Sequence, residues 1–410
     1  MASQTLSCRA NLAGPRPTAR RCAGSARVAA RASPSVRCEA GAKDQHLPTV
    51  SITKRALLSG AAALGAVGAI ELPRMAPAFA DVVAAEWEKI NLPVPEGVVL
   101  LDIGFEEGDP NHGFILGTGQ TLLETTDGGK SWSKRDIPQA EDEGINYRFQ
   151  SISFAGKEGW IVGKPAILLH TNDGGVNWER IPLSAKLPGA PLNIYALPGE
   201  AGQAEMVTDQ GAIYVTSNTG YNWTAGVEET VDATLNRTVS SGISGASYYE
   251  GFFSTVKRSA TGEYVAVSSR GNFYMTWAPG QSYWFPHNRP TARRVQSMGW
   301  DPNNKIWLTN RGGGVFLANK EGLADTDDFD AQNLQSRGYG MLDIGFSTDP
   351  NVGFACGGSG SLFKTTDGGK TWKRVKGVDQ IAGNLYEVKF FAGNRGFVLG
   401  NDGILLRYIV

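Results

Sequence analysis

Arginine is the residue type whose chemistry and placement in this 410-residue chain indicate a binding surface. A guanidinium group is planar, keeps its charge, and binds carboxylates or backbone carbonyls through paired hydrogen bonds. Seven arginines stand just before short alternating segments or in the glycine turns that link them: Arg148, Arg237, Arg270, Arg293, Arg294, Arg311 and Arg337. If the fold gathers them, they form a surface for anionic or carbonyl-rich partners. The alternative is that each arginine pairs with a nearby acid and joins parts of the fold.

The other reactive side chains form no catalytic or metal-binding pattern. His112, His170 and His287 are scattered without the spacing of a metal site. Cys356 is the only cysteine in residues 81–410, so neither a disulfide nor a cysteine metal site is possible within that segment. No pair of acid and nucleophile suited to glycoside hydrolysis can be assigned. We therefore expect no enzyme activity, no metal and no cofactor.

A repeated turn motif identifies the elements that must position the arginines. Thr125-Thr-Asp-Gly-Gly-Lys-Ser-Trp132 recurs at 171–178 and 365–372, and in degenerate form at 216–223. This pattern is called an Asp box: the aspartate accepts backbone N–H bonds and the glycines supply positive φ angles. We expect the boxes to be structural rather than ligand sites. Their key residues are Asp127, Trp132, Asp173, Trp178, Asn218, Trp223, Asp367 and Trp372.

The tryptophans set a period that predicts the fold. Trp87, Trp132, Trp178 and Trp223 follow one another at intervals of 45, 46 and 45 residues. Trp284 comes 61 residues later, which indicates an insertion near residues 249–262. Short strands in units of this length are typical of propeller blades. Seven units can be counted, so we predict an all-β, seven-bladed β-propeller of four-stranded blades over residues 81–410.

The last unit ends after three strands at the C-terminus. Glu86-Trp87-Glu-Lys-Ile-Asn-Leu-Pro93 resembles the fourth strand of another unit, Asn177-Trp178-Glu-Arg-Ile-Pro182. We therefore expect the N-terminal strand of the segment 81–410 to complete the last blade, which removes the free edges of the ring. In this topology the first strands line the channel. Loops before first strands and turns between second and third strands share one face, which places the seven arginines and Lys164 together.

The first eighty residues predict two targeting signals. Residues 1–45 are rich in Arg, Ala and Ser and nearly free of acids, which is typical of a chloroplast transit peptide; the alternative is a disordered basic tail that binds nucleic acid. Residues 46–80 read as an export signal to the thylakoid lumen: Lys54-Arg55, a short apolar run, and a cleavage site ending at Ala80. The pair Lys54-Arg55 leaves the choice between the twin-arginine and Sec routes open.

Charge argues against nucleic acid as the partner of the remaining segment. Residues 1–80 hold 11 of the 39 Lys and Arg residues and 3 of the 40 Asp and Glu residues, which leaves residues 81–410 with a net charge of −9. An acidic body has no electrostatic attraction for phosphate backbones.

These features together resemble the plastid photosystem II stability/assembly factor family over residues 81–410. The motifs that carry the resemblance are the Asp boxes, the segment Tyr147-Arg-Phe-Gln-Ser-Ile-Ser-Phe154 and the two-stage signal. The resemblance implies a non-enzymatic factor of the thylakoid lumen that binds newly made D1, especially the C-terminal extension of its precursor, and helps D1 join D2 in assembly intermediates. It also implies an arginine-rich patch on one propeller face and a longer middle blade. We expect a monomer that is peripheral to the membrane and binds no nucleic acid.

Two rival functions remain open at this point. Sialidases use Asp-box propellers and gather arginines around a carboxylate, but they need an arginine ahead of the first box. No arginine lies between Asp81 and Asp127, and the near match Arg180-Ile-Pro182 follows a box tryptophan. The second rival is a general lumenal binding propeller with another client.

Overall fold

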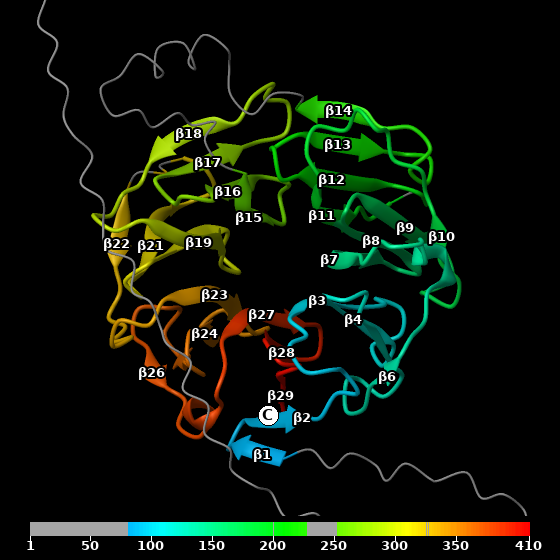
Figure 1. Cartoon of the computed structure of the whole chain (residues 1–410). Helices are drawn as coiled ribbons and strands as arrows, with labels where there is room; N and C mark the ends of the chain where they lie inside the picture. The colour runs from blue at the N-terminus through cyan, green and yellow to red at the C-terminus, as the bar shows by residue number, and fades with distance from the viewer. Residues whose placement is uncertain (1–80, 200, 228–251, 325, 327) are drawn as a thin grey trace, which may run out of the picture. The chain divides into compact units, whose positions relative to one another are not determined.

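Seven antiparallel sheets follow one another around a ring in the computed structural model of the chain (Figure 1). The structure describes residues 81–199, 201–227, 252–324, 326 and 328–410. The two predicted signals, with the cleavage site at Ala80, and Arg237 lie outside these residues. The seven sheets confirm the predicted seven-bladed β-propeller.

Six blades contain four strands in sequence order, starting from the channel. Blade 1 is β3 (Leu100–Phe105), β4 (Gly113–Gly117), β5 (Leu122–Thr125) and β6 (Ser133–Lys134), and blade 2 is β7 (Arg148–Ala155), β8 (Glu158–Lys164), β9 (Ile167–Thr171) and β10 (Glu179–Arg180). Blade 3 is β11 (Pro191–Ala196), β12 (Ala204–Thr208), β13 (Ile213–Thr216) and β14 (Thr224–Val227), and blade 4 is β15 (Phe253–Arg258), β16 (Tyr264–Ser268), β17 (Phe273–Trp277) and β18 (Phe285–Asn288). Blade 5 is β19 (Val295–Trp300), β20 (Lys305–Asn310), β21 (Val315–Glu321) and β22 (Phe329–Ala331), and blade 6 is β23 (Met341–Phe346), β24 (Gly353–Gly357), β25 (Leu362–Thr365) and β26 (Lys373–Arg374).

Blade 7 joins the two ends of the described chain. It consists of β27 (Leu385–Phe391), β28 (Arg395–Gly400), β29 (Leu405–Tyr408), then β2 (Trp87–Ile90) and β1 (Asp81–Ala84). β2 pairs with β29 in antiparallel register, Trp87 opposite Tyr408, which confirms that the N-terminal strand closes the last blade. β1 gives this blade one strand more than the other six.

The extra length of blade 4 lies earlier than the sequence indicated. Residues 253–258 form its first strand β15, and the turn at 259–263 leads directly into β16, so the predicted insertion near residues 249–262 is misplaced. The additional residues fall between Val227 and Phe253. The error arose because tryptophan spacing gives the length of a unit but not the loop that contains the excess.

Two 3-10 helices, η1 (Pro138–Ala140) and η2 (Val378–Gln380), are the only helical elements among the described residues. Nowhere in the described ranges is there a helix with the length and apolar character needed to cross a bilayer.

Packing between blades uses the tryptophans of the Asp boxes. Trp132 of blade 1 belongs to a buried cluster with Phe105 and with Phe397 of blade 7. Trp178 of blade 2 meets Phe114 of blade 1, with ring centroids 5.8 Å apart. Buried aromatic surface of this size contributes strongly to stability. The ring is therefore a rigid frame for whatever its loops and channel present.

Candidate functional site: the channel mouth and the arginine face

Every first strand carries a register irregularity near its start, and this repeated bulge shapes the channel. In β3 the irregularity falls between Leu100 and Asp102, and the other six first strands repeat it at the equivalent place. A bulge inserts one extra residue and turns its neighbours. The residues that follow the seven bulges all line the channel: Asp102, Ser151, Asn193, Thr255, Ser297, Asp343 and Glu387.

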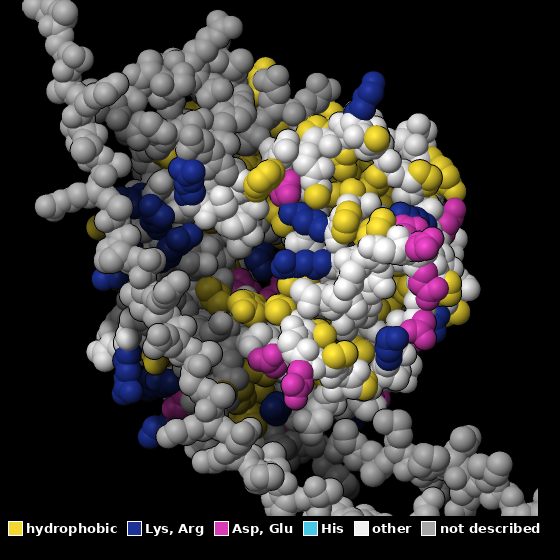
Figure 2. Space-filling model, in the orientation of Figure 1, with side chains coloured by type: hydrophobic (Ala, Val, Ile, Leu, Met, Phe, Trp, Pro, Cys, Tyr) yellow, Lys and Arg dark blue, Asp and Glu magenta, His cyan; other side chains and the backbone are white. Residues whose placement is uncertain are grey.

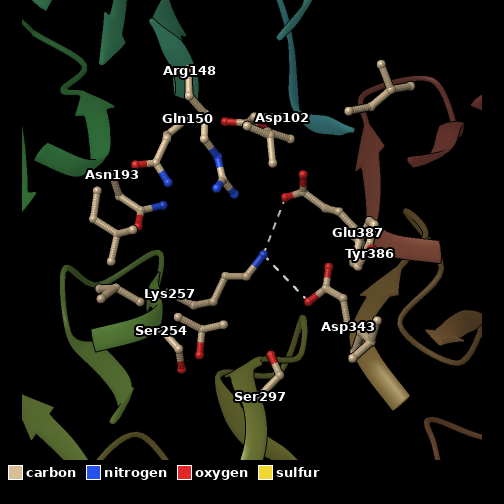
Figure 3. Close-up of a pocket in the computed structure, with 16 residues that line it drawn as sticks. Asp102, Arg148, Gln150, Asn193, Ser254, Lys257, Ser297, Asp343, Tyr386 and Glu387 are labelled. Carbon is tan, nitrogen blue, oxygen red and sulfur yellow. Dashed lines mark hydrogen bonds and ion pairs between the residues drawn. The ribbon is translucent and has the colours of Figure 1, made fainter. Parts of the chain in front are cut away.

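Charged side chains concentrate on this ring and on the positions two residues further along. The ammonium group of Lys257 lies 3.4 Å from Glu387 Oε1 and 3.6 Å from Asp343 Oδ1 (Figure 3). Lys389 Nζ lies 2.7 Å from Asp102 Oδ1. Three carboxylates and two ammonium groups thus meet inside the channel, and the guanidinium group of Arg148 points into the same pocket (Figure 3).

Two of these acids also join neighbouring blades. Asp102 Oδ2 accepts the backbone N–H of Ile152 at 2.8 Å, from blade 1 to blade 2. Asp343 Oδ2 accepts the N–H of Val388 at 3.1 Å, from blade 6 to blade 7. The two aspartates occupy equivalent positions in the repeated sequence Leu-Asp-Ile-Gly-Phe. Glu387 has no such backbone donor among the described residues.

Burial controls the protonation of Glu387. Burial raises the pKa of Glu387 to about 7, and the negative charge of Asp102 adds to this effect while Lys257 and Lys389 oppose it. Burial also raises the pKa of Asp343, although Lys257 and hydrogen bonds act in the opposite direction. Glu387 is therefore the channel acid that changes charge near neutral pH.

Sequence reasoning did not single out this charged network. A signal existed in the two Leu-Asp-Ile-Gly-Phe segments, because an aspartate in an otherwise apolar strand must have a buried partner. Lys257 and Lys389 gave no comparable signal, since their partners are 86 and 287 residues away in the chain.

The structure places the six described arginines as the propeller topology predicted. Arg148 is the first residue of β7 and lines the channel mouth. Arg293 and Arg294 precede β19, and Arg337 precedes β23. Two more lie in turns between second and third strands: Arg270 between β16 and β17, and Arg311 between β20 and β21. All six are exposed, and we call the surface that they share the arginine face.

Contacts among the loops hold most of the arginine face together around blade 5. The N–H of Val295 donates to Gly271 O at 2.8 Å, which fixes the Arg270 turn beside the start of β19. The N–H of Arg311 donates to Arg294 O at 2.9 Å, and its guanidinium donates to Ser269 O at 3.1 Å. Figure 2 shows Lys and Arg side chains gathered over the region of β19, β21 and β22 and again beside the central hollow.

Five of the six exposed guanidinium groups are not neutralised by acids on the described part of the chain. Within the described residues, no ion pair joins a carboxylate to Arg148, Arg293, Arg294, Arg311 or Arg337. Lys164 differs from them, because its ammonium lies 2.5 Å from Asp209 Oδ2 and its charge is already paired. Arg180 likewise pairs with Asp142 at 2.6 Å on the outer strand β10.

The Asp boxes are closed turns whose polar groups bond to one another. Asp127 Oδ1 accepts the N–H groups of Lys130 and Ser131 at 2.9 Å, and its Oδ2 accepts the Ser131 hydroxyl at 2.6 Å. Partial burial acts to raise the pKa of Asp127, but hydrogen bonds from Ser131, Thr125 and Lys130 outweigh it and lower that pKa.

The other boxes repeat this arrangement. Asp367 accepts the same two kinds of bond from Thr371, and Asp173 accepts them from Asn177. In the degenerate box, Asn218 accepts the Asn222 N–H at 2.9 Å. Trp223 packs near Trp160, and Trp372 joins a cluster with Trp307.

Gly129 shows why the box needs glycine. Its φ is +85°, and an added Cβ would lie 2.6 Å from the ring of Phe397 in blade 7. No group of three or more His, Cys, Asp and Glu side chains that could hold a metal ion occurs in the described ranges.

A polar, acid-lined channel that opens within a face of exposed arginines defines a seven-bladed Asp-box propeller whose charged surface is suited to binding. Residues 79–409 match the family described as photosynthesis system II assembly factor YCF48, and the chain belongs to that family.

Relatives in plants and algae are similar over most of their length. The photosystem II stability/assembly factor HCF136, chloroplastic, of Oryza sativa subsp. japonica is 56% identical over 398 residues, covering 91% of this chain and 95% of the rice protein. The structure of YCF48 from Cyanidioschyzon merolae is 48% identical with a TM-score of 0.70, covering 79% of this chain and 98% of that one. A structure of YCF48 bound to a D1 peptide is 41% identical with a TM-score of 0.68, covering 79% and 97%. These relatives make the chain a chloroplast or thylakoid-associated protein.

Proposed function

We propose that this protein is a non-enzymatic photosystem II assembly factor of the thylakoid lumen that binds newly made D1 and its precursor. In this role it promotes the joining of D1 with D2 during assembly of the reaction centre. The structure of a family member bound to a D1 peptide supports D1 as the client. The chain acts as a monomer that is peripheral to the membrane.

The observation that carries the proposal is the set of unpaired arginines on one face. Five guanidinium groups lack a carboxylate partner among the described residues, although residues 81–410 carry a net charge of −9. Exposed like charges repel one another unless a ligand uses them. Planar guanidinium groups bind carboxylates and peptide carbonyls in fixed geometry, which suits an acidic or extended segment of a membrane protein client.

Hydrolysis in the manner of sialidases is less well supported. The only near match to their arginine motif, Arg180, is used in an ion pair with Asp142 and a hydrogen bond to the Tyr147 hydroxyl. It sits on the outer strand β10, away from the channel-lining first strands. No arginine lies between Asp81 and Asp127, where such an enzyme needs one ahead of its first box.

A triple variant tests the arginine face. Arg148→Gln, Arg294→Gln and Arg337→Gln together remove three charges from exposed positions that make no ion pair with a described residue. We expect at least tenfold weaker binding of a synthetic peptide with the C-terminal sequence of precursor D1, measured by fluorescence anisotropy. Binding of the unmodified protein should weaken with added salt, because exposed charges are screened.

A matched control changes the same charge on the opposite face. Lys130, Lys157 and Lys370 are exposed and lie in or next to turns between first and second or third and fourth strands. Lys130→Gln, Lys157→Gln and Lys370→Gln together should leave peptide affinity within twofold. Equal loss in both triple variants would show that net charge, not the arginine face, governs binding. Loss of folding in the arginine variant, seen by circular dichroism, would assign these residues to blade contacts instead.

Capture of newly labelled thylakoid proteins tests the client. Recovery of D1 and its precursor with D2 is the expected result, and the arginine triple variant should recover neither. Recovery of other subunits without D1 would identify the chain as a lumenal propeller with a different client. Protease protection after import into isolated chloroplasts tests the lumenal location, and light scattering after gel filtration tests the monomer.

A further inference from the structure

The bulges in the seven first strands place one residue of each blade at the rim of the channel. A bulge leaves its extra residue outside the strand ladder. The seven extra residues, none of them buried, are Leu101, Gln150, Leu192, Ser254, Gln296, Leu342 and Tyr386. All but Gln296 line the cavity of about 210 Å³ at the channel mouth, and Arg148 points into the same cavity (Figure 3). The rim therefore presents one accessible side chain from each blade to a ligand.

Apolar side chains are concentrated on one side of this rim. Leu342, Tyr386 and Leu101 come from blades 6, 7 and 1, which are consecutive in the ring (Figure 1). Figure 2 shows hydrophobic side chains gathered beside the central hollow over β23 and β27. Ser254 and Gln296, the rim residues of blades 4 and 5, are polar. We call the surface formed by Leu101, Leu342 and Tyr386 the apolar arc.

The packing between blades does not explain why the arc is apolar. Within the described residues, the buried clusters that join the blades include neither the two leucines of the arc nor Tyr386. Leu192, at the equivalent position of blade 3, differs because it packs against the buried cluster shared by blades 3 and 4. Tyr386 is 37% exposed. Apolar side chains that gather at an opening without joining the core are typical of a surface that binds a partner.

Cationic side chains face the apolar arc from the other side of the channel mouth. The arginines of blades 4 and 5 lie in loops that open on the same face: Arg270, Arg293, Arg294 and Arg311. Arg148 makes the two regions continuous, because it belongs to the arginine face and lines the cavity together with the arc. A ligand that lies across the mouth therefore meets apolar surface at one end and guanidinium groups at the other.

We propose that the apolar arc is an anchor site for one large apolar side chain of an extended acidic polypeptide segment, whose carboxylates bind the arginine face. Guanidinium–carboxylate hydrogen bonds orient the segment, and burial of the apolar side chain adds affinity and selects the sequence. Each residue of the arc is followed directly in the chain by a channel acid, Asp102, Asp343 or Glu387. The apolar surface is therefore one residue deep, which suits a side chain and not an acyl chain. This inference deepens the proposed function, and only its choice of client rests on that function.

Two peptides of equal charge test the anchor site. Acetyl-Gly-Glu-Gly-Leu-Gly-Glu-Gly-amide carries one apolar side chain between two carboxylates, and its counterpart has asparagine, which is similar in size, in place of leucine. We expect saturable binding of the leucine peptide to the full chain by ligand-observed NMR, and at least fivefold weaker binding of the asparagine peptide. Equal affinities, or no saturable binding of the leucine peptide, would overturn the proposal.

Variants test whether the apolar arc is the source of this preference. Leu342→Asn and Tyr386→Asn together remove most of its apolar surface, and this arc variant should bind the two peptides within twofold of each other. Val176→Asn and Tyr221→Asn make a matched change at exposed positions of two Asp boxes and should keep the fivefold preference. Leu101→Asn alone, a milder change, should reduce the preference at least twofold. A preference that survives in the arc variant, or that disappears in the Asp-box control, would overturn the assignment to the arc.

Two further measurements identify the kind of ligand. Vesicles of phosphatidylglycerol test a lipid: if they displace the leucine peptide and the arc variant no longer binds them, the arc holds an acyl chain and the polypeptide proposal is overturned. The triple variant Arg148→Gln, Arg294→Gln and Arg337→Gln should bind both peptides at least fivefold more weakly. Unchanged affinity of this variant for both peptides would overturn the pairing of carboxylates with the arginine face.

The same proteins separate the anchor site from the proposed function. If the native protein prefers the leucine peptide through the arc but does not bind D1 peptide, the proposed function fails and the anchor site stands. If D1 peptide binds through the arginines while the arc variant keeps the preference for leucine, the anchor site fails and the proposed function stands.

Discussion

Trp87 of β2 and Tyr408 of β29 lie opposite each other in antiparallel register, with ring centroids 5.2 Å apart, and so join the two ends of the described chain. Trp87 is fully buried and also meets the ring of Phe354 in blade 6 at 5.0 Å. One side chain therefore closes blade 7 and packs it against its neighbour. Loss of this side chain is therefore expected to weaken both contacts.

Trp87→Ala should lower the free energy of unfolding by about 3–5 kcal/mol, because it removes a fully buried aromatic side chain and leaves a cavity between two blades. Urea denaturation followed by tryptophan fluorescence measures the change. Val82→Ala in the neighbouring strand β1 is the control, since Val82 is 69% exposed and its replacement should cost well under about 1 kcal/mol. Similar decreases in the free energy of unfolding in the two variants would show that Trp87 in β2 does not stabilise the closed ring.

Asn218→Asp should stabilise blade 3 by restoring a complete Asp box. Asn218 accepts the Asn222 N–H, whereas Asp173 in the equivalent box also accepts the Asn177 side-chain amide at 2.8 Å through its second oxygen. An added hydrogen bond to a charged acceptor at this exposed turn is expected to contribute about 0.5–1 kcal/mol.

The stability gained by Asn218→Asp should depend on pH in the same direction as the contribution of Asp173, which occupies the equivalent position in its own box. Burial acts to raise the pKa of Asp173, but hydrogen bonds from Asn177 and Thr171 lower it overall. A lowered folded-state pKa gives stability that is present above the unfolded value and lost as pH falls through the folded value. Denaturation at pH 7 and at pH 3 tests this expectation; a gain that is equal at both would contradict it.

Glu387→Gln should change how stability responds to pH around neutrality. The pKa of Glu387 is raised to about 7, so its contribution to folding is fully present below the unfolded value and is lost as pH rises through 7. Asp102, Asp343, Lys257 and Lys389 surround it, with Tyr195 on β11 and Arg148 on β7 lining the same channel.

The native protein should therefore lose up to about 3 kcal/mol relative to Glu387→Gln between pH 5 and pH 8, the free energy that corresponds to the rise in pKa. Melting curves of both proteins across this range, with Glu321→Gln as the control, give the comparison. Parallel pH profiles for the native protein and Glu387→Gln would show that Glu387 does not titrate near neutrality.

Cys356 should resist thiol reagents in the folded state of residues 81–410. The side chain is fully buried in β24, and burial raises the pKa of its thiol, with the charges of Asp343 and Glu387 adding to the effect. Only the thiolate reacts, so labelling by a disulfide reagent should be at least a hundredfold slower than in urea. Rapid labelling of the folded segment would mean that blade 6 opens readily.

Local chemistry made much of the architecture predictable. The Asp boxes and the tryptophan spacing are signals contained within about one blade, because a box turn needs its aspartate, glycines and tryptophan close to one another in the chain. The closing role of Trp87 was also predictable, because residues 86–93 resemble the strand after Trp178. Even Arg148, Arg294 and Arg311 could be assigned to one face, since the order of strands in a blade determines which loops share a side.

Interactions between residues of different blades could not be predicted from the sequence in the same way. Nothing near Lys164 in the chain indicates that Asp209 neutralises it, whereas Arg148 carries no such partner among the described residues. The insertion was misplaced because period length does not reveal which loop is longer. The seven bulges were missed because a single extra residue does not disturb a period of about 45 residues.

By itself the amino-acid sequence determined the repeating unit, the number of blades, the closing strand and the side of the ring on which the arginines lie, because these follow from contacts within a unit and from strand order. Only the tertiary structure decided which charges remain unpaired and which acids meet Lys257. Those pairings depend on ring closure, which brings Asp102, Asp343 and Glu387 together from different blades into one channel.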